Sequence, residues 1–114
     1  MSDCLFCKIV AGEIPCSKAY EDDTVLAFND IDPQAPTHIL IVPKKHFDSI
    51  LELGAEDAAL LSHMFEVANR LAGEKGFAQN GFRLVINTGK DGGQSVPHLH
   101  LHLMGGRAFG WPAG

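Results

Sequence analysis

The sequence predicts an α+β fold in which a layer of short strands packs against one long helix. Three observations support this class. The chain has 114 residues, of which 46% are hydrophobic, enough for one buried core. One long segment carries apolar residues at helical spacing, and several short segments rich in β-branched or alternating apolar residues lie between glycines and prolines. No repeat or low-complexity tract divides the chain, so we expect one domain over residues 1–114.

The first part of the chain is expected to hold a short helix and three strands. Residues 4–12 favour a short helix that ends at a glycine. Residues 18–29 favour two strands around an acidic turn at 21–23. Residues 30–36 are expected to form a loop, because two prolines interrupt any strand there. Residues 38–42 form a β-branched run before a proline, which predicts a central strand.

The second part is expected to hold the long helix and two more strands. Residues 55–75 predict the helix, which a glycine at 76 ends. The apolar stripe of this helix consists of Leu60, Met64, Val67 and Leu71. Residues 82–87 predict a strand, residues 88–97 a glycine-rich loop, and residues 98–103 the last strand.

Charge and the N-terminal segment exclude some classes of protein. Nine basic and 14 acidic residues give a net charge of −5, which argues against a protein that binds a nucleic-acid backbone. A single nucleotide is not excluded, because a few backbone N–H groups can hold its phosphates. The first residues do not resemble a signal peptide, and no stretch reaches the roughly 18 apolar residues of a membrane-spanning helix. We therefore expect a cytoplasmic protein without a membrane partner.

Three histidines alternate with leucines in the last predicted strand. Side chains of a strand repeat every two residues, so His98, His100 and His102 are expected to face one way, with the leucines facing the core. We expect the histidine face to be the polar, solvent side of the sheet. Surface histidines and a metal site are two possible interpretations. Catalysis is the third, because imidazole is a nucleophile, an acid or a base near neutral pH.

The cysteines suggest a second site near the N-terminus. Cys4 and Cys7 have the Cys-x-x-Cys spacing of zinc ligands, which supplies two of the four that a structural zinc needs. A reduced buried pair and a redox pair are the alternatives. Cys16 stands apart from both.

The histidine segment and its surroundings resemble a known family. Residues 98–104 read HLHLHLM, similar to the motif of the histidine-triad (HIT) family, in which three histidines alternate with hydrophobic residues. The flanking segments resemble the Hint branch of that family: GGQSVP at 92–97, GGR at 105–107, PQAPTH at 33–38, IVPKKH at 41–46 and WPAG at 111–114. The resemblance runs from about residue 6 to the C-terminus. It implies a HIT-like antiparallel sheet with one long helix and a short N-terminal helix, continued across a two-fold homodimer.

The resemblance also implies an activity. Members of this branch are purine-nucleotide-binding hydrolases that cleave the P–N bond of nucleoside phosphoramidates. His100 would attack the α-phosphorus to form a nucleotidyl-histidine, which water then hydrolyses, without a catalytic metal. His98, His102 and His38 would complete the catalytic group, with Ser95 beside the departing group. For His38 a structural role at the start of a strand is the alternative. Other possible functions are a dinucleoside polyphosphate hydrolase, as in the Fhit branch, and a non-catalytic, zinc-stabilised nucleotide-binding regulator.

Binding residues follow from the same resemblance. Asp30 would accept hydrogen bonds from the ribose hydroxyls. The expected phosphate contacts are Asn87, Gly93, Gln94 and Ser95, although a glycine-rich loop is also common in hairpins. The expected apolar walls of the purine pocket are Leu5, Phe6, Ile9, Phe28 and Ile31, for which ordinary core packing is the alternative.

Two further expectations concern zinc and the C-terminal tail. Several HIT proteins hold a structural zinc with two cysteines and two histidines, while close Hint relatives lack the cysteines. In this chain, His46 and His98 would complete such a set with Cys4 and Cys7. A structural Zn²⁺ is therefore the expected cofactor. Trp111, in a tail that can form neither helix nor strand, is expected to dock near the active site of the partner subunit, with docking on its own subunit as the alternative.

Overall fold

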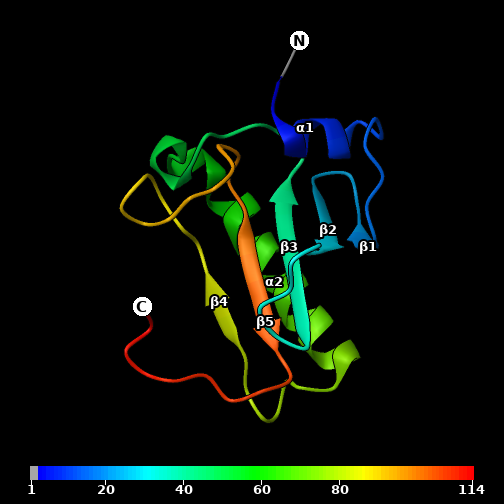
Figure 1. The fold of residues 1–114 in the computed structure, drawn as a ribbon. Coiled ribbons are helices and arrows are strands. Elements are labelled where there is room, and N and C mark those ends of the chain that lie inside the picture. The colour runs from blue at the N-terminus through cyan, green and yellow to red at the C-terminus, as the bar shows by residue number, and fades with distance from the viewer. Residues whose placement is uncertain (1–2) are drawn as a thin grey trace.

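The computed structural model describes residues 3–114, and its centre is a five-stranded antiparallel sheet with the strand order β1-β2-β3-β5-β4 (Figure 1). The strands are β1 (Lys18–Glu21), β2 (Val25–Asn29), β3 (Thr37–Pro43), β4 (Arg83–Val85) and β5 (Leu101–Gly105). The helices are α1 (Leu5–Val10) and α2 (Ala58–Lys75), and two short 3₁₀ turns, Ile50–Glu52 and Ala55–Asp57, precede α2. The predicted α+β class is confirmed. No helix within residues 3–114 is both long and apolar enough to cross a membrane.

β3 is the central strand of the sheet, and its pairing with β5 joins the most distant parts of the sequence. β3 pairs with β2 on one side and with β5 on the other, and His38 lies opposite Met104 while Leu40 lies opposite His102. β5 is followed outward by the short edge strand β4. This register places the end of the histidine segment beside the histidine of β3.

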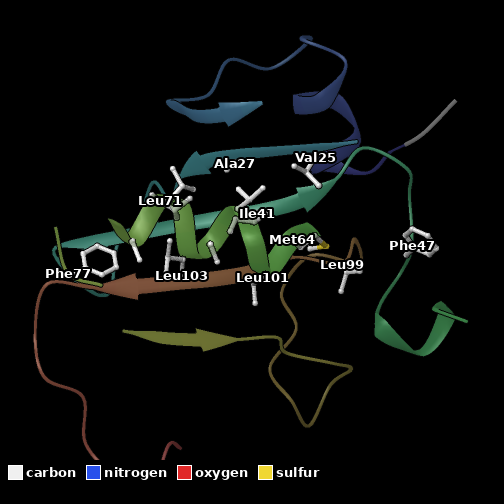
Figure 2. Close-up of a cluster of buried hydrophobic side chains, with 14 residues drawn as sticks. Val25, Ala27, Ile41, Phe47, Met64, Leu71, Phe77, Leu99, Leu101 and Leu103 are labelled. Carbon is white, nitrogen blue, oxygen red and sulfur yellow. The ribbon is translucent and has the colours of Figure 1, made fainter. Parts of the chain in front are cut away.

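One face of the sheet packs against α2 and forms the larger core. Ile39 and Ile41 of β3 lie on this face, together with the leucines of the histidine segment (Figure 2). Met64, Val67 and Leu71 of the predicted stripe are buried against them, and Leu60 is partly buried. The predicted inward direction of Leu99, Leu101 and Leu103 is confirmed, because each is at most 1% exposed.

The opposite face is covered by α1 and holds the histidines. Phe6 of α1 packs against Phe28 and Leu40, and its ring lies edge-on to the rings of His98 and His100. The expectation that the histidines face solvent is therefore wrong. His98 is 0% and His100 is 3% exposed. The reason is the packing of α1, a contact between distant parts of the sequence that strand periodicity does not reveal.

Several element ends differ from the predicted ones. β5 begins at Leu101 rather than at residue 98, because the preceding backbone pairs with a loop: the Leu99 N–H donates to the Phe47 carbonyl (2.7 Å). β4 is limited to Arg83–Val85 within the predicted 82–87. The predicted helix at 55–75 opens as a 3₁₀ turn and becomes α-helical at Ala58. It ends at Gly76 as predicted, where φ is +87°, a conformation that favours glycine.

A polar cluster joins α2 to the turn between β1 and β2. The imidazole of His63 donates from Nε2 to Asp22 (2.6 Å), and its Nδ1 lies 3.4 Å from Glu66. The Tyr20 hydroxyl donates to the same Asp22 carboxylate (2.8 Å). The hydrogen bond to Asp22 is the main reason why the pKa of His63 is raised, and burial opposes it. Protonated His63 is thus an electrostatic link between helix and sheet.

His63→Gln is expected to lower stability by about 0.5 kcal/mol at pH 6, the range of partly exposed ion pairs, and by less at pH 9. The folded-state pKa is raised, so this contribution is complete below the unfolded value of 6.5 and is lost as pH rises through the folded value. Urea unfolding at both pH values measures it. Asn69→Ala, on an exposed position of the same helix, is the control and should show no such pH dependence. An equal loss for His63→Gln at both pH values would contradict the link.

Candidate active site

A cavity of about 300 Å³ lies between α1 and the histidine face of the sheet. Its polar groups come from Asp30, Ser95, His100 and His102. Its apolar walls are Leu5, Phe6, Ile9, Ile14, Pro15, Phe28, Ile31, Leu40 and Val96. The structure thus brings together most of the predicted catalytic and purine-binding residues around one space.

His100 presents an unprotonated nitrogen. Its Nδ1 lies 2.7 Å from the backbone carbonyl of His98, and a carbonyl can only accept, so Nδ1 carries the proton. Nε2 of the neutral ring therefore keeps its lone pair. Burial lowers the pKa of His100, so the ring is neutral at physiological pH. A neutral imidazole held in this tautomer can act as a nucleophile through Nε2.

A chain of hydrogen bonds gives His102 the opposite role. The Gln34 backbone N–H donates to Nδ1 of His38 (3.1 Å), so the proton of neutral His38 sits on Nε2. That Nε2–H donates to Nδ1 of His102 (2.9 Å). The proton of His102 is then on its Nε2, a buried atom with no hydrogen-bond partner within residues 3–114. An unpaired buried donor is costly, and a ligand oxygen in the cavity would satisfy it.

The protonation of this pair follows from its surroundings. The pKa of His102 is lowered to about 4, mainly by burial and in the same direction by the neighbouring His100 and His38, while Asp30 opposes the shift. Burial also lowers the pKa of His38, against the opposing effect of Asp30 and Asp32. Both rings are neutral at pH 7, which the tautomer chain requires.

Asp30 offers acceptor oxygens at the rim of the same cavity. One carboxylate oxygen accepts from the Asp32 backbone N–H (2.9 Å), and the other lies 3.5 Å from Nε2 of His38. Neighbouring Ile31 is fully exposed, although it lines the cavity. The exposed apolar side chain of Ile31 is therefore suited to pack against the flat ring of a ligand in the cavity.

The glycine-rich loop meets the cavity at Ser95 and Val96. The backbone N–H of Gly93 donates to Lys90 (3.1 Å), and that of Gln94 donates to Gly89 (3.0 Å). These two N–H groups are thus used inside the loop, and a phosphate could reach them only by displacing those bonds. Asn87, Gly93 and Gln94 are not among the described residues that line the cavity.

A second cluster lies next to the cavity. Its members are Cys4, Cys7, His46 and His98, whose ligand atoms all lie within 4.8 Å of one another. Nε2 of His98 donates to the Pro43 carbonyl (2.9 Å), and Nε2 of His46 donates to Asp48 (2.6 Å). Both Nδ1 atoms therefore present lone pairs, and they lie 3.1 Å apart.

The cluster fits a tetrahedral metal. Ligand atoms around a four-coordinate zinc are separated by about 3.3–3.8 Å, given Zn–N and Zn–S bonds of about 2.0–2.3 Å. Here the Cys4 sulfur is 3.3 Å from Nδ1 of His98, and the Cys7 sulfur is 3.3 Å from Nδ1 of His46. Two facing lone pairs repel unless a cation lies between them, and hydrogen bonds from the rear nitrogens are typical of metal-bound histidines.

The C-terminal tail is held at its base and free at its tip. The Phe109 ring lies near the guanidinium groups of Arg83 (5.2 Å) and Arg107 (4.2 Å), and Arg83 donates to the Gly110 carbonyl (2.7 Å). Trp111 is nevertheless 85% exposed. It does not dock on its own subunit, so that alternative is wrong for the single chain.

Sequence reasoning missed four residues of the cavity. They are Ile14, Pro15, Leu40 and Val96. Leu40 could have been predicted, because it lies two residues from His38 on the same strand and therefore on the same face. Ile14 and Pro15 follow α1, and their place depends on how that helix docks.

Comparison of this chain with known proteins agrees with this arrangement. The HIT domain model matches residues 11–109, and the chain belongs to this family of histidine-triad proteins. It is 47% identical over 106 residues to the purine nucleoside phosphoramidase of Escherichia coli, covering 93% of this chain and 89% of that protein. It is 50% identical over 112 residues to an uncharacterized HIT-like protein of Synechococcus elongatus, covering 98% and 97% of the two chains.

A solved structure matches in shape as well. The crystal structure of a HIT family hydrolase from Legionella pneumophila superposes with a TM-score of 0.97 at 51% identity, covering 98% of this chain and 100% of that one. The predicted family is therefore confirmed, and with it the place of the chain among HIT hydrolases.

Proposed function

We propose that this chain hydrolyses purine nucleoside phosphoramidates through a covalent nucleotidyl-histidine. The observation that carries the proposal is the pair of opposite tautomers at the cavity: an unprotonated Nε2 on His100 beside an Nε2–H on His102 that has no partner among residues 3–114. One is an electron-pair donor for phosphorus, and the other is a hydrogen-bond donor for a phosphoryl oxygen. The E. coli relative, a purine nucleoside phosphoramidase, supports the same reaction.

The reaction has two steps at phosphorus. Nε2 of His100 forms a bond to the α-phosphorus while the bond from phosphorus to the amine nitrogen breaks, and the amine leaves with a proton acquired through solvent. Water then attacks the same phosphorus, the bond to His100 breaks, and the nucleoside monophosphate is released. The Nε2–H of His102 stabilises the charge on a non-bridging oxygen in both steps. Ser95, at the cavity wall, donates a hydrogen bond to the departing nitrogen.

The remaining cavity residues suit the nucleoside. The Asp30 carboxylate accepts from the ribose hydroxyls, and the purine lies between the apolar side chains of α1 and Ile31. His38 acts through His102 rather than on substrate, and His98 acts through its carbonyl on His100. Both are positioning residues in this proposal.

A release assay tests the proposal. Purified protein is incubated with an alkylamine phosphoramidate of adenosine monophosphate and, separately, with diadenosine polyphosphate. Faster release of adenosine monophosphate from the phosphoramidate supports the proposal. Preference for the polyphosphate would favour the dinucleoside polyphosphate hydrolase instead. Tight nucleotide binding without turnover would favour the regulatory protein.

We also propose that the Cys4, Cys7, His46 and His98 cluster holds one structural zinc. A zinc with four protein ligands has no open position for substrate, so its contribution is to fix the start of α1 under the sheet. Because Phe6 and Ile9 of α1 form walls of the cavity, the cluster would also steady the nucleotide pocket. The cytoplasmic location stays a prediction.

A homodimer is part of the same proposal. β4 is an edge strand of three half-buried residues, and an edge gains backbone hydrogen bonds by pairing with a second copy. The exposed Trp111 gains a binding surface in the same step. Both features favour a two-fold dimer whose tails reach the partner's active site.

Deletion of residues 109–114 is therefore expected to leave the dimer intact and to lower kcat/KM unequally for bulky and small amine leaving groups, by about 10-fold for the bulkier one. The physical reason is that the indole ring would contact the leaving group rather than the nucleotide. Sedimentation velocity and steady-state kinetics on two phosphoramidates measure the two parts. An identical loss for both substrates, or none, would exclude the tail from substrate selection.

A further inference from the structure

The polar groups of Gln94 are committed to the protein itself. Its side-chain carbonyl oxygen accepts from the Gly89 backbone N–H (3.0 Å). Its side-chain amide nitrogen donates to the carbonyls of Asp48 (2.6 Å) and Val96 (3.0 Å), which uses both of its hydrogens. The side chain therefore ties the glycine-rich loop to the segment before the first 3₁₀ turn.

A second tie lies a few residues further along the chain. The Leu99 N–H donates to the carbonyl of Phe47, the neighbour of Asp48. Residues 94–99 are thus anchored at both ends against the same short segment. Ser95 follows the first anchor directly, while His100 follows the second.

Besides these two anchors, the partly buried side chain of Val96 packs against Phe6 and its apolar neighbours. Gly89 and Gly93 have positive φ values of +70° and +77°, so the loop contains two residues with wide conformational freedom. The backbone bonds from Gly93 to Lys90 and from Gln94 to Gly89 both join residues within the loop. The polar attachment of this loop nearest to Ser95 is therefore the Gln94 side chain.

We infer that Gln94 is a positioning residue that sets the place of Ser95 relative to His100, rather than a ligand of the phosphate. The inference rests on the proposed function, in which the Ser95 hydroxyl donates to the departing nitrogen as its bond to phosphorus breaks. Loss of Gln94 frees the first anchor and leaves the second, so Ser95 shifts while the nucleophile stays in place.

Kinetics of Gln94→Ala, Ser95→Ala and the double variant test this role. For an alkylamine leaving group, kcat of Gln94→Ala should fall between about 10-fold and 100-fold with KM within about 3-fold, the effect of a misplaced reacting group. For an arylamine, which leaves more easily, the loss should be much smaller. The double variant should be no slower than Ser95→Ala by more than about 2-fold, because both changes remove one interaction. Gln79→Ala, exposed in the turn after α2, is the matched control.

Three kinetic results would overturn the inference: a rate within 2-fold of the parent, multiplicative losses in the double variant, or a raised KM at unchanged kcat. The last is the result expected of a phosphate ligand.

Amide hydrogen exchange provides a readout that needs no turnover. The Gly89 amide should exchange at least about 10-fold faster in Gln94→Ala, because its acceptor is gone, and should not change in Ser95→Ala. An unchanged exchange rate of the Gly89 amide would contradict the hydrogen bond from Gly89 to the Gln94 side chain. If the parent protein hydrolyses no phosphoramidate, the proposed function fails, whereas the exchange experiment still decides whether Gln94 holds the loop.

Discussion

Replacement of His100 by alanine is expected to abolish phosphoramidate hydrolysis, lowering kcat by about 10⁴-fold or more, as loss of a covalent nucleophile does. The structure offers no nearby substitute. Nδ1 of His102 accepts from His38, and its Nε2 carries a proton, so neither nitrogen can attack phosphorus. His98 faces the cysteine cluster through its Nδ1. Single-turnover kinetics on the purified variant measure the loss.

The fold and nucleotide binding of the variant should persist, because the main apolar walls of the cavity remain. Thermal unfolding and titration with adenosine monophosphate are the controls. An acid quench should trap a nucleotidyl adduct on the parent protein and none on His100→Ala. Retention of more than a tenth of the parent rate would remove His100 from the role of nucleophile.

The second large effect is expected at the cysteine cluster. Cys4→Ser should lower the free energy of unfolding by about 3 kcal/mol or more, since the binding energy of a structural zinc contributes directly to folding. For a chain of this size the melting temperature should fall by about 10 °C or more. Protein purified without added metal should contain about one zinc per chain by elemental analysis, and a strong chelator should reproduce the shift.

Cys16→Ser is the matched control for this experiment, because Cys16 lies outside the cluster and is partly buried like Cys4. It should leave both zinc content and melting temperature nearly unchanged. Protein without zinc that also melts independently of chelator would exclude the metal and leave the cysteines as packing residues. Equal shifts for both cysteine variants would do the same.

The elements that could be predicted from sequence are those governed by local periodicity. Met64, Val67 and Leu71 repeat at helical spacing, and Leu99, Leu101 and Leu103 alternate, so the faces of α2 and β5 followed from the pattern alone. Gly76 marked the end of α2 because of its backbone freedom. The ends of the elements were predicted less accurately. The predicted start of β5 was too early, because the backbone of Leu99 bonds to the loop at Phe47 instead of to a neighbouring strand.

What could not be predicted depends on contacts between distant residues. The burial of His98 and His100 results from α1, which covers the face expected to be open. The hydrogen bond from Gln94 to Asp48 spans 46 positions, and no local sequence pattern indicates it. The tautomers of the histidines depend on Gln34 and on backbone carbonyls, which are known only once the chain is folded.

The strand order has a consequence for how the protein is made. His38 and His102 are 64 positions apart, yet β5 inserts between β3 and β4, which are both synthesised before it. A chain emerging from the ribosome therefore has a gap between β3 and β4, with Ile39 and Ile41 lacking their partners until residues 101–105 appear. Such late, non-local pairing slows folding and leaves strand edges unpaired and prone to aggregation in the meantime. The exposed edge of β3 is therefore open to pairing with other chains until β5 has been made.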